Sequence, residues 1–281
     1  MVRGFAIPDF AIMFSMIKFL NGQELAGFIK QRQAAQVRGL RQASKIFPKL
    51  AIIQTIDDPV VNTYVRLKCE YADDIGVAVD VHKIAQDEVP SKVAELNSDS
   101  SVHGIIIQLP LQDPSDTDDI LNLVNPDKDV DGLGGGAKYD PATAVAINWL
   151  LTGYNIELLG KKITIIGNGR LVGAPLARMW RNSGLDVTVL DSSTTDVKST
   201  AIRSDLLVSA TGVPGIITGD MIQPGAVVVD AGTTSDSGHI VGDVAEEVYE
   251  RDDITITPHR GGVGPLTIAA LMDNVLRVAR G

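Results

Sequence analysis

The chain has 281 residues, a net charge of −10 and a pI near 4.8, an acidic balance that argues against nucleic acid or an anionic membrane as the main partner. Hydrophobic residues make up 44% and charged residues 21%, so the chain has the composition of a folded protein with one large or two modest domains. Cys69 is the only cysteine, which excludes an internal disulfide and a CxxC metal site and suits a reducing, cytoplasmic compartment.

The first fifteen residues are apolar but lack the organisation of a signal peptide. Arg3 supplies the only charge ahead of the apolar run, Pro8 and Asp9 interrupt it, and no small-residue cleavage site follows. The stretch is also too short and broken to span a bilayer. We expect either a start at Met16 or an extension without a role in the fold.

Short β-rich runs alternate with helical stretches, which is the pattern of an α/β protein with largely parallel sheets. In the first half, strands are predicted at residues 50–56, 77–82 and 104–109. Helices are predicted near residues 22–44, 60–75, 87–97 and 116–124. A glycine-rich stretch at residues 131–136 then precedes a helix that contains residues 147–151.

The alternation restarts in the second half, after a predicted domain boundary near residues 150–160. Strands are predicted at residues 162–166, 187–190, 206–209, 226–230 and 254–257. Residues 265–280 are predicted to form a closing helix.

A glycine loop follows the strand predicted at residues 162–166. Gly167, Gly169 and Gly173 give G-x-G-x-x-x-G, a spacing variant of the dinucleotide-binding fingerprint, and a helix begins near Ala174. A turn without Cβ atoms lets backbone N–H groups and a helix N-terminus approach a pyrophosphate. Strand, loop, helix and second strand occur in the required order, which predicts a Rossmann-like NAD(P) site.

The preference between NAD and NADP depends on two charged residues. Asp191 ends the second strand, 24 residues after Gly167, where a carboxylate typically binds the ribose 2′-OH and repels a 2′-phosphate. NAD is therefore slightly favoured, the alternative being that Asp191 is a solvent-facing turn residue. Arg170 is able to reach a phosphate of either cofactor. The expected cofactor-binding residues are Gly167, Asn168, Gly169, Arg170, Leu171, Val172, Gly173, Asp191, Thr211 and Gly212.

Candidate chemistry in the first half begins with Tyr64 and Lys68, which share a helix face because they are four residues apart. By spacing alone, such a pair more often lies at the polar edge of an amphipathic helix than in a functional site. Gln108 lies near the C-terminal end of an apolar strand, where ligands of open α/β sheets bind. The Leu-Pro-Leu exit from that strand favours a constrained turn with a cis peptide before Pro110. Asp131, at a glycine turn, is either a turn residue or a ligand for an amidine-like edge such as a pterin.

A set of motifs then occurs in a fixed order along the chain. They are Y-x-x-x-K, G-I-I-I-Q-L-P-L, P-D-K-D-V-D-G-L, I-G-x-x-x-x-V-G-x-P, G-D-x-I-x-P-G-A-V-V-V-D, V-G-D-V and G-G-V-G-P-L-T. Together they resemble the bifunctional methylenetetrahydrofolate dehydrogenase/methenyltetrahydrofolate cyclohydrolase family over roughly residues 17–280.

The resemblance implies two three-layer α/β domains. The first is a folate-binding catalytic domain at residues 17–150, joined by a returning C-terminal helix at residues 265–281, and the second is a Rossmann-like NAD(P)-binding domain at residues 151–264. It also implies a homodimer. The implied activity is oxidation of 5,10-methylenetetrahydrofolate to 5,10-methenyltetrahydrofolate with NAD or NADP, followed by hydrolysis to 10-formyltetrahydrofolate.

Site residues follow from the same resemblance. Lys68 would act on the bridging one-carbon unit and on the water that opens the methenyl ring, helped by burial that lowers its pKa. Gln108 would orient Lys68, Tyr64 would stack on the folate ring and Asp131 would anchor the pterin. The residues expected to complete the substrate cleft are Gly261, Gly262, Val263 and Arg260.

The sequence departs from the family pattern at several positions. Val61 replaces a serine, Ala142 replaces a cysteine, and Asn168-Gly169 replaces an Arg-Ser pair. Arg260 adds a cation, either for a glutamate tail of the folate or as a solvated side chain. These changes keep two alternatives open: a dehydrogenase with weak or no cyclohydrolase activity, and a non-catalytic nucleotide- or folate-binding protein. The four histidines are scattered, so no metal site is expected.

Overall fold

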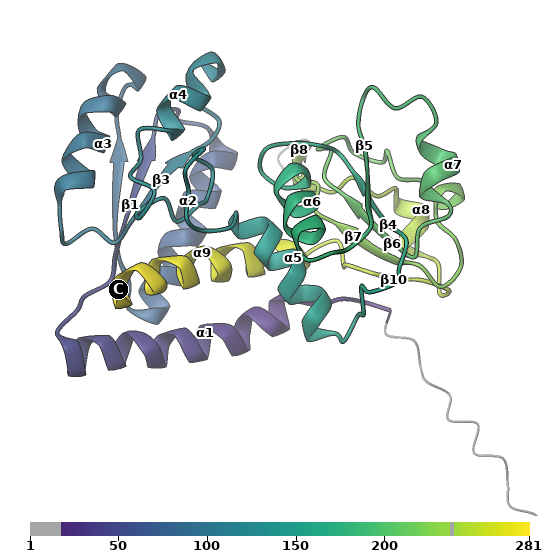
Figure 1. Cartoon of the computed structure of the whole chain (residues 1–281), viewed down its shortest axis with the longest axis horizontal. Coiled ribbons are helices and arrows are strands. Elements are labelled where there is room, and N and C mark those ends of the chain that lie inside the picture. The colour runs from purple at the N-terminus through teal and green to yellow at the C-terminus, as the bar shows by residue number, and fades with distance from the viewer. Residues whose placement is uncertain (1–17, 237–238) are drawn as a thin grey trace, which may run out of the picture.

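The computed structural model describes residues 18–236 and 239–281, which form two α/β domains connected by long helices (Figure 1). The expected start at Met16 and the extension before it lie outside the described residues. Within the described ranges, no helix is long and apolar enough to cross a membrane.

The first domain contains a three-stranded parallel sheet in the order β2-β1-β3. Its strands are β1 (Lys49–Gln54), β2 (Ala78–Lys83) and β3 (Gly104–Gln108). Gln54, the last residue of β1, is in register with Lys83 and with Gln108. The carboxyl ends of all three strands therefore meet at one edge, where a ligand site is expected.

Helices cover both faces of this sheet, which gives the predicted three layers. One face packs on α1 (Gly22–Gly39), α2 (Pro59–Ile75) and α9 (Val263–Arg280), and the other on α3 (Val89–Ser98) and α4 (Thr117–Leu121). The alternation of strand side chains explains both contacts, because Ile106 packs toward α2 and α9 while Ile105 and Ile107 pack toward α3 and α4. A short π-helical segment, Leu40–Ser44, continues α1.

Helix α2 is fixed by its ends. The Asp58 carboxylate accepts hydrogen bonds from the backbone N–H groups of Val60 and Val61 at 2.8 and 3.1 Å, and Pro59 occupies the first turn. The strand predicted at residues 50–56 therefore stops at Gln54, since the following residues turn into this cap. Gly76, with φ of 84°, ends the helix.

The second domain is built on a five-stranded parallel sheet in the order β10-β7-β6-β4-β5. The strands are β4 (Ile163–Ile166), β5 (Val187–Leu190), β6 (Leu206–Ser209), β7 (Val227–Asp230) and β10 (Thr255–Ile256). A small antiparallel hairpin, β8 (Thr234–Asp236) and β9 (His239–Val241), was not predicted.

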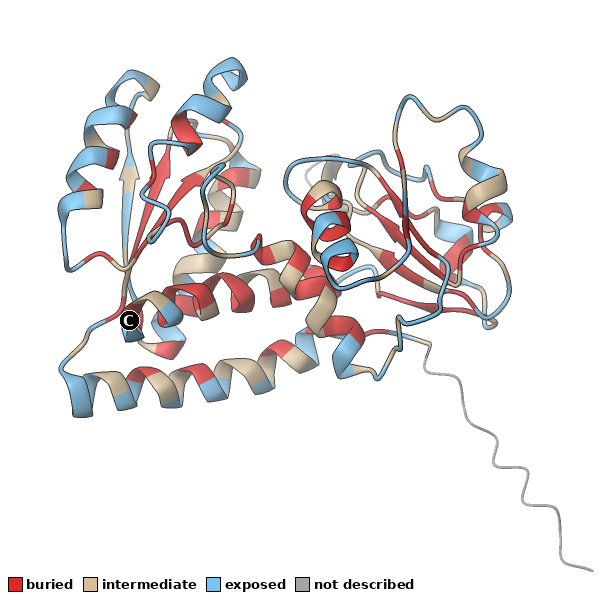
Figure 2. Ribbon diagram, in the orientation of Figure 1, coloured by how far each residue is buried: buried red, intermediate tan, exposed pale blue. Residues whose placement is uncertain are grey.

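Helices also cover both faces of the second sheet. One side holds α5 (Ala142–Gly153) and α6 (Gly173–Asn182), and the other holds α7 (Val197–Ala201) and α8 (Glu246–Tyr249). Short 3₁₀ turns occur at Gln86–Glu88, Pro114–Asp116 and Gly219–Met221. Burial is concentrated on most of the strands and on the helix faces turned toward them, whereas β2 is largely exposed (Figure 2).

The two domains are tied together at both ends of the described chain. Phe19 bridges Ile256, and the Leu20 N–H donates to the Ile256 carbonyl at 2.9 Å, so residues before α1 extend the second sheet. Helix α9 then runs beside α1 and packs in the core of the first domain (Figure 1). The predicted return of the C-terminal helix is confirmed, with a start at Val263.

Candidate active site

Lys68 and Gln108 meet at the carboxyl edge of the first sheet. Lys68 Nζ donates a hydrogen bond of 2.7 Å to Gln108 Oε1, joining α2 to the end of β3. The other end of the Gln108 amide is also fixed, because its Nε2 donates to the Leu109 carbonyl at 2.9 Å. The amide oxygen is therefore held facing the lysine. The peptide between Leu109 and Pro110 is cis, as the Leu-Pro-Leu exit predicted.

Asp131 is the third polar group of this cluster. Burial lowers the pKa of Lys68, and the nearby Asp131 carboxylate opposes that effect by stabilising the ammonium. Burial likewise raises the pKa of Asp131, against the attraction of Lys68. The structure thus places the predicted lysine, glutamine and aspartate together, and burial moves the amine toward the pKa range of a proton-transfer group.

The loop that carries Asp131 is held by other residues. The buried Asp129 carboxylate accepts from the N–H groups of Gly132 and Gly134 at 3.0 and 2.7 Å. From α9, the buried Asn274 Nδ2 donates to the Val130 carbonyl at 2.9 Å. Because Asp129 and Asn274 shape the turn, the Asp131 carboxylate is left to act on Lys68 and a ligand.

Tyr64 lies one helical turn before Lys68 on α2 and is partly exposed, as a residue that stacks on a ligand must be. Val61, which replaces a serine in the family pattern, is buried on the preceding turn. Cys69 is partly buried against the core, and burial raises the pKa of its thiol. This environment supports a packing role for Cys69.

Gln54 is a polar residue of this edge that the sequence analysis did not identify. Its side chain is buried, and its Nε2 donates to Asn62 Oδ1 at 2.8 Å and to the Ile56 carbonyl at 2.6 Å. Its Oε1 is buried without a hydrogen-bond partner among the described residues. The available signal was the same one that identified Gln108, a polar side chain at the end of an apolar strand.

The glycine loop lies at the carboxyl edge of the second sheet, between β4 and α6. A Cβ on Gly173 would come within 1.8 Å of the Gly167 carbonyl oxygen, and Gly167 has φ of 102°. Only glycine therefore fits at these two positions. The N-terminus of α6 has no side-chain cap. Of its first three residues, Ala174 donates its N–H to the Gly169 carbonyl at 3.1 Å and Pro175 has no N–H, so the N–H of Gly173 is the one left for an anion. These features fit the phosphates of a dinucleotide.

The other expected cofactor residues surround this loop. Asp191 follows β5, which is hydrogen-bonded to β4, and its carboxylate accepts from Ser193 N and Oγ at 3.0 and 2.6 Å. These bonds hold the pKa of Asp191 below its usual range, so the group is anionic. Thr211 and Gly212 follow the neighbouring strand β6, and the Thr234 hydroxyl donates to the Gly212 carbonyl at 2.5 Å.

The buried carboxylate of Asp243 holds the loop that contains Thr211. The sequence analysis gave Asp243 no role. Asp243 Oδ2 accepts from Ser209 Oγ and from the Thr211 N–H, both at 2.6 Å. Asp230 in turn accepts from the Asp243 N–H at 3.0 Å, and burial raises its pKa. The only sequence signal was the V-G-D-V motif, which does not state that its aspartate is buried.

The turn from Gly261 to Val263 joins β10 to α9. The Gly261 carbonyl accepts from the Gln23 N–H at 2.8 Å, which fixes the turn against the first turn of α1. Gly262 and Val263 are buried, whereas Arg260 is exposed beside His259. The structure thus places this turn where the domains connect. A role for these residues in binding folate stays a prediction.

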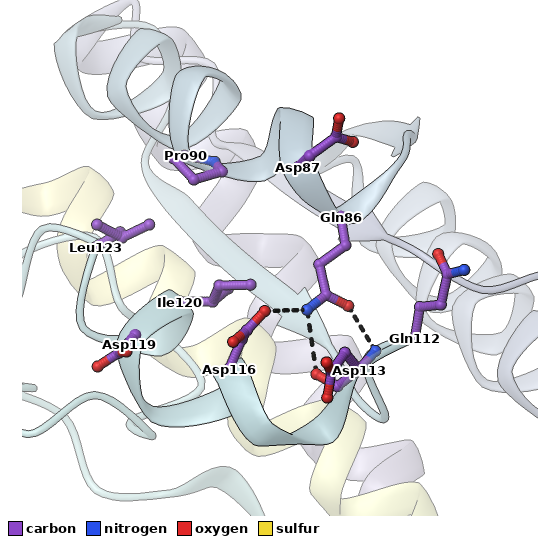
Figure 3. A pocket seen from close by; sticks show the side chains of 9 residues that line it. All are labelled: Gln86, Asp87, Pro90, Gln112, Asp113, Asp116, Asp119, Ile120 and Leu123. Atoms are coloured by element: carbon purple, nitrogen blue, oxygen red, sulfur yellow. Dashed lines mark hydrogen bonds between the residues drawn. The ribbon is translucent and has the colours of Figure 1, made fainter.

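A separate depression of about 790 Å³ lies on the outer side of the first domain, between α3 and α4 (Figure 3). Gln86 closes one side through hydrogen bonds to the Asp113 carbonyl at 3.1 Å and to the Asp116 carboxylate at 2.9 Å. None of the predicted site residues lines it. The depression is therefore separate from the Lys68 cluster.

Comparisons with known proteins agree with this geometry. A model of the tetrahydrofolate dehydrogenase/cyclohydrolase catalytic domain matches residues 20–131, and a model of the NAD(P)-binding domain of the same enzymes matches residues 141–281. The bifunctional protein FolD of Amoebophilus asiaticus is 40% identical over an alignment that covers 94% of this chain and 97% of that protein.

Solved structures give the same result. The bifunctional enzyme FolD, a methylenetetrahydrofolate dehydrogenase/cyclohydrolase from Campylobacter jejuni, is 36% identical with a TM-score of 0.88, covering 94% of this chain and 99% of that one. The corresponding enzyme of Trypanosoma brucei, solved with NADP and an inhibitor, is 31% identical with a TM-score of 0.87, covering 94% and 97%.

Proposed function

The chain belongs to the tetrahydrofolate dehydrogenase/cyclohydrolase family, and from that premise we propose that the Lys68 cluster and the glycine loop are the two halves of one active site. The protein is an NAD(P)-dependent dehydrogenase that oxidises 5,10-methylenetetrahydrofolate and a cyclohydrolase that hydrolyses the methenyl product to 10-formyltetrahydrofolate. The observation that carries the proposal is the 2.7 Å hydrogen bond from Lys68 to Gln108, beside Asp131.

Lys68 is the proposed catalytic residue of the hydrolysis. Hydrolysis adds water to the bridging carbon and breaks one carbon–nitrogen bond, so a proton must leave the water and one must reach the departing nitrogen. A partly buried amine with a lowered pKa carries out both transfers, accepting the first proton and donating the second. Gln108 holds the amine in place, because its own amide is fixed at both ends.

Tyr64 and Asp131 are the proposed folate ligands. Tyr64 offers a partly exposed ring on the same helix face as Lys68, which suits stacking on a pterin. Asp131 offers a carboxylate to the amino and ring N–H donors of the pterin, a charge-assisted contact. Gly261, Gly262, Val263 and Arg260 are proposed to complete the cleft from the second domain.

A bound nicotinamide nucleotide supplies the hydride acceptor for the oxidation. The residues that would hold it are those of the loop from Gly167 to Gly173, with Thr211 and Gly212 in the loop that follows β6. Their fit is supported by the tight turn in which Gly173 packs against the Gly167 carbonyl, and by the start of α6, which has no side-chain cap. The contribution of the protein to this step is to position the folate carbon against the nicotinamide.

We propose NAD as the slightly preferred nucleotide. Asp191 is anionic at the end of β5, where it would bind ribose hydroxyls and repel a 2′-phosphate, and Asn168 lacks the charge to offset it. Initial rates with NAD and NADP, measured side by side, test this. Asp191→Ser should raise the NADP to NAD ratio of kcat/KM at least several-fold, and an unchanged ratio would contradict the role of Asp191.

Two further proposals concern the state of the protein. We expect a homodimer formed through the second domain, which sedimentation at several protein concentrations tests directly. We expect it to work in the cytoplasm, in keeping with the single cysteine.

The experiment for the function as a whole separates the two half-reactions. The purified protein should reduce NAD or NADP with methylenetetrahydrofolate, and should hydrolyse methenyltetrahydrofolate without nucleotide. Failure in both assays would overturn the proposal. Dehydrogenation without hydrolysis would instead support the weak-cyclohydrolase alternative, for which the buried Val61 gives a specific reason. Val61→Ser should then restore hydrolysis.

A further inference from the structure

An ion pair joins the two domains at the glycine loop. Arg170, in the loop between β4 and α6, pairs through its guanidinium with the carboxylate of Asp118 on α4 of the first domain. The two residues are 52 positions apart in the chain and lie in different domains. The guanidinium also holds the pKa of Asp118 below its usual range, so the pair is fully charged.

Arg170 is the cation of the loop that is expected to receive the phosphates. The helix start offers the N–H of Gly173 and no side-chain cap, and a guanidinium adds a charge-assisted bond to a phosphate oxygen. A phosphate at this loop and the carboxylate of Asp118 therefore compete for one guanidinium. Arg170 can bind a phosphate only if its ion pair with Asp118, which joins the two domains, is broken.

We propose that Asp118, a residue of the folate domain, determines nucleotide affinity by competing with the cofactor phosphate for Arg170. This inference rests on the proposed function, because it requires the nucleotide to bind at the glycine loop. Asp118 lowers nucleotide affinity through Arg170, without touching the nucleotide itself.

The expected size of the effect follows from exposure. The Arg170 and Asp118 side chains are 39% and 72% exposed, so water and salt screen the pair and its strength is that of an exposed ion pair. Asp118→Asn should therefore tighten nucleotide binding by roughly two- to fivefold at low ionic strength. The gain should shrink as salt is added, because the Debye length falls to about 3 Å at 1 M.

The chain offers a matched control in Asp119. Asp118 and Asp119 both lie in the first turn of α4, so either substitution removes one charge from the same helix end. Asp119 lines the depression between α3 and α4 (Figure 3), whereas Asp118 pairs with Arg170. Asp119→Asn thus reports the general effect of removing a negative charge near the site, and also any loss of helix stability.

The experiment is a calorimetric titration of the full chain with NAD and with NADP, without folate. Asp118→Asn should have the lower Kd, Asp119→Asn should match the original chain, and Asp118→Asn should have no effect in an Arg170→Gln background. Arg178→Gln, an exposed arginine on α6, controls for the arginine change. The inference is overturned if the two aspartate variants behave alike, or if the Asp118 effect persists without Arg170.

Failure of the proposed function gives a different result. If the original chain binds neither nucleotide, both the cofactor site and this inference are wrong. If it binds nucleotide and turns over folate but Asp118→Asn changes nothing, only the inference is wrong. Melting temperatures of the two aspartate variants should agree, which confirms that a shift in Kd does not come from unfolding.

Discussion

Replacing Gln108 by alanine removes the acceptor that holds Lys68. The bond is 2.7 Å long and its donor carries a charge, a class of hydrogen bond that contributes about 1.5–3 kcal/mol. Lys68 is partly accessible, so solvent replaces part of this contribution. We therefore expect hydrolysis of methenyltetrahydrofolate to slow by roughly 10- to 50-fold, at 1.4 kcal/mol per factor of ten.

The same substitution also changes the pH dependence. The amide oxygen accepts from the ammonium form of Lys68 and stabilises it, so its loss should lower the pKa of Lys68 beyond the lowering that burial already causes. Hydrolysis requires the neutral amine and rises with pH through that pKa. The rising limb of kcat should therefore move to lower pH in Gln108→Ala, while the maximum falls.

The assay is the loss of methenyltetrahydrofolate absorbance at several pH values, corrected for the uncatalysed rate. Gln112→Ala is the matched control, because Gln112 is an exposed glutamine of the loop that follows β3. The reasoning is refuted if Gln108→Ala keeps both the rate and the position of the limb. A lower rate with an unmoved limb would show that Gln108 orients Lys68 without affecting its protonation.

Further predictions concern the groups around these two sites. Asp131→Asn removes a charge that raises the pKa of Lys68, so the limb of the hydrolysis profile should move to lower pH and the folate KM should rise. Asn274→Leu leaves a buried carbonyl of the Asp131 loop without its donor and should lower the free energy of unfolding by about 1–3 kcal/mol, measured by urea denaturation. Gly173→Ala should weaken nucleotide binding at least tenfold, whereas Gly169→Ala, where a Cβ meets no atom within 4 Å, should bind normally; equal affinities would contradict the close approach in this loop.

The fold was largely readable from the sequence, because buried parallel strands are continuous apolar runs. The strand ending at Gln108 and the glycine loop after Ile166 are local patterns, and each was predicted within a residue or two of its observed position. The β8–β9 hairpin was missed because its residues, from Thr234 to Val241, show no sustained alternation of apolar and polar residues.

Contacts between distant parts of the chain were not readable. Nothing near Phe19 indicates that it bridges Ile256, and nothing near Arg170 indicates Asp118, since both depend on the packing of whole domains. The pairing of Lys68 with Gln108 was predicted only through the resemblance to a family. The spacing of residues along a helix predicts which side chains share a face, but it does not predict which strand that face contacts. Gln54 was missed, although it ends a strand in the same register as Gln108.

Hydrolysis of methenyltetrahydrofolate by Lys68→Ala, with nucleotide affinity determined on the same sample, tests the central claim most directly. Lys68 lies in the first domain, on α2, whereas the glycine loop lies in the second. We predict that hydrolysis falls to the uncatalysed rate while the Kd for NAD and NADP stays unchanged. Hydrolysis at the original rate in a folded Lys68→Ala protein would contradict the assignment of the folate chemistry to this cluster.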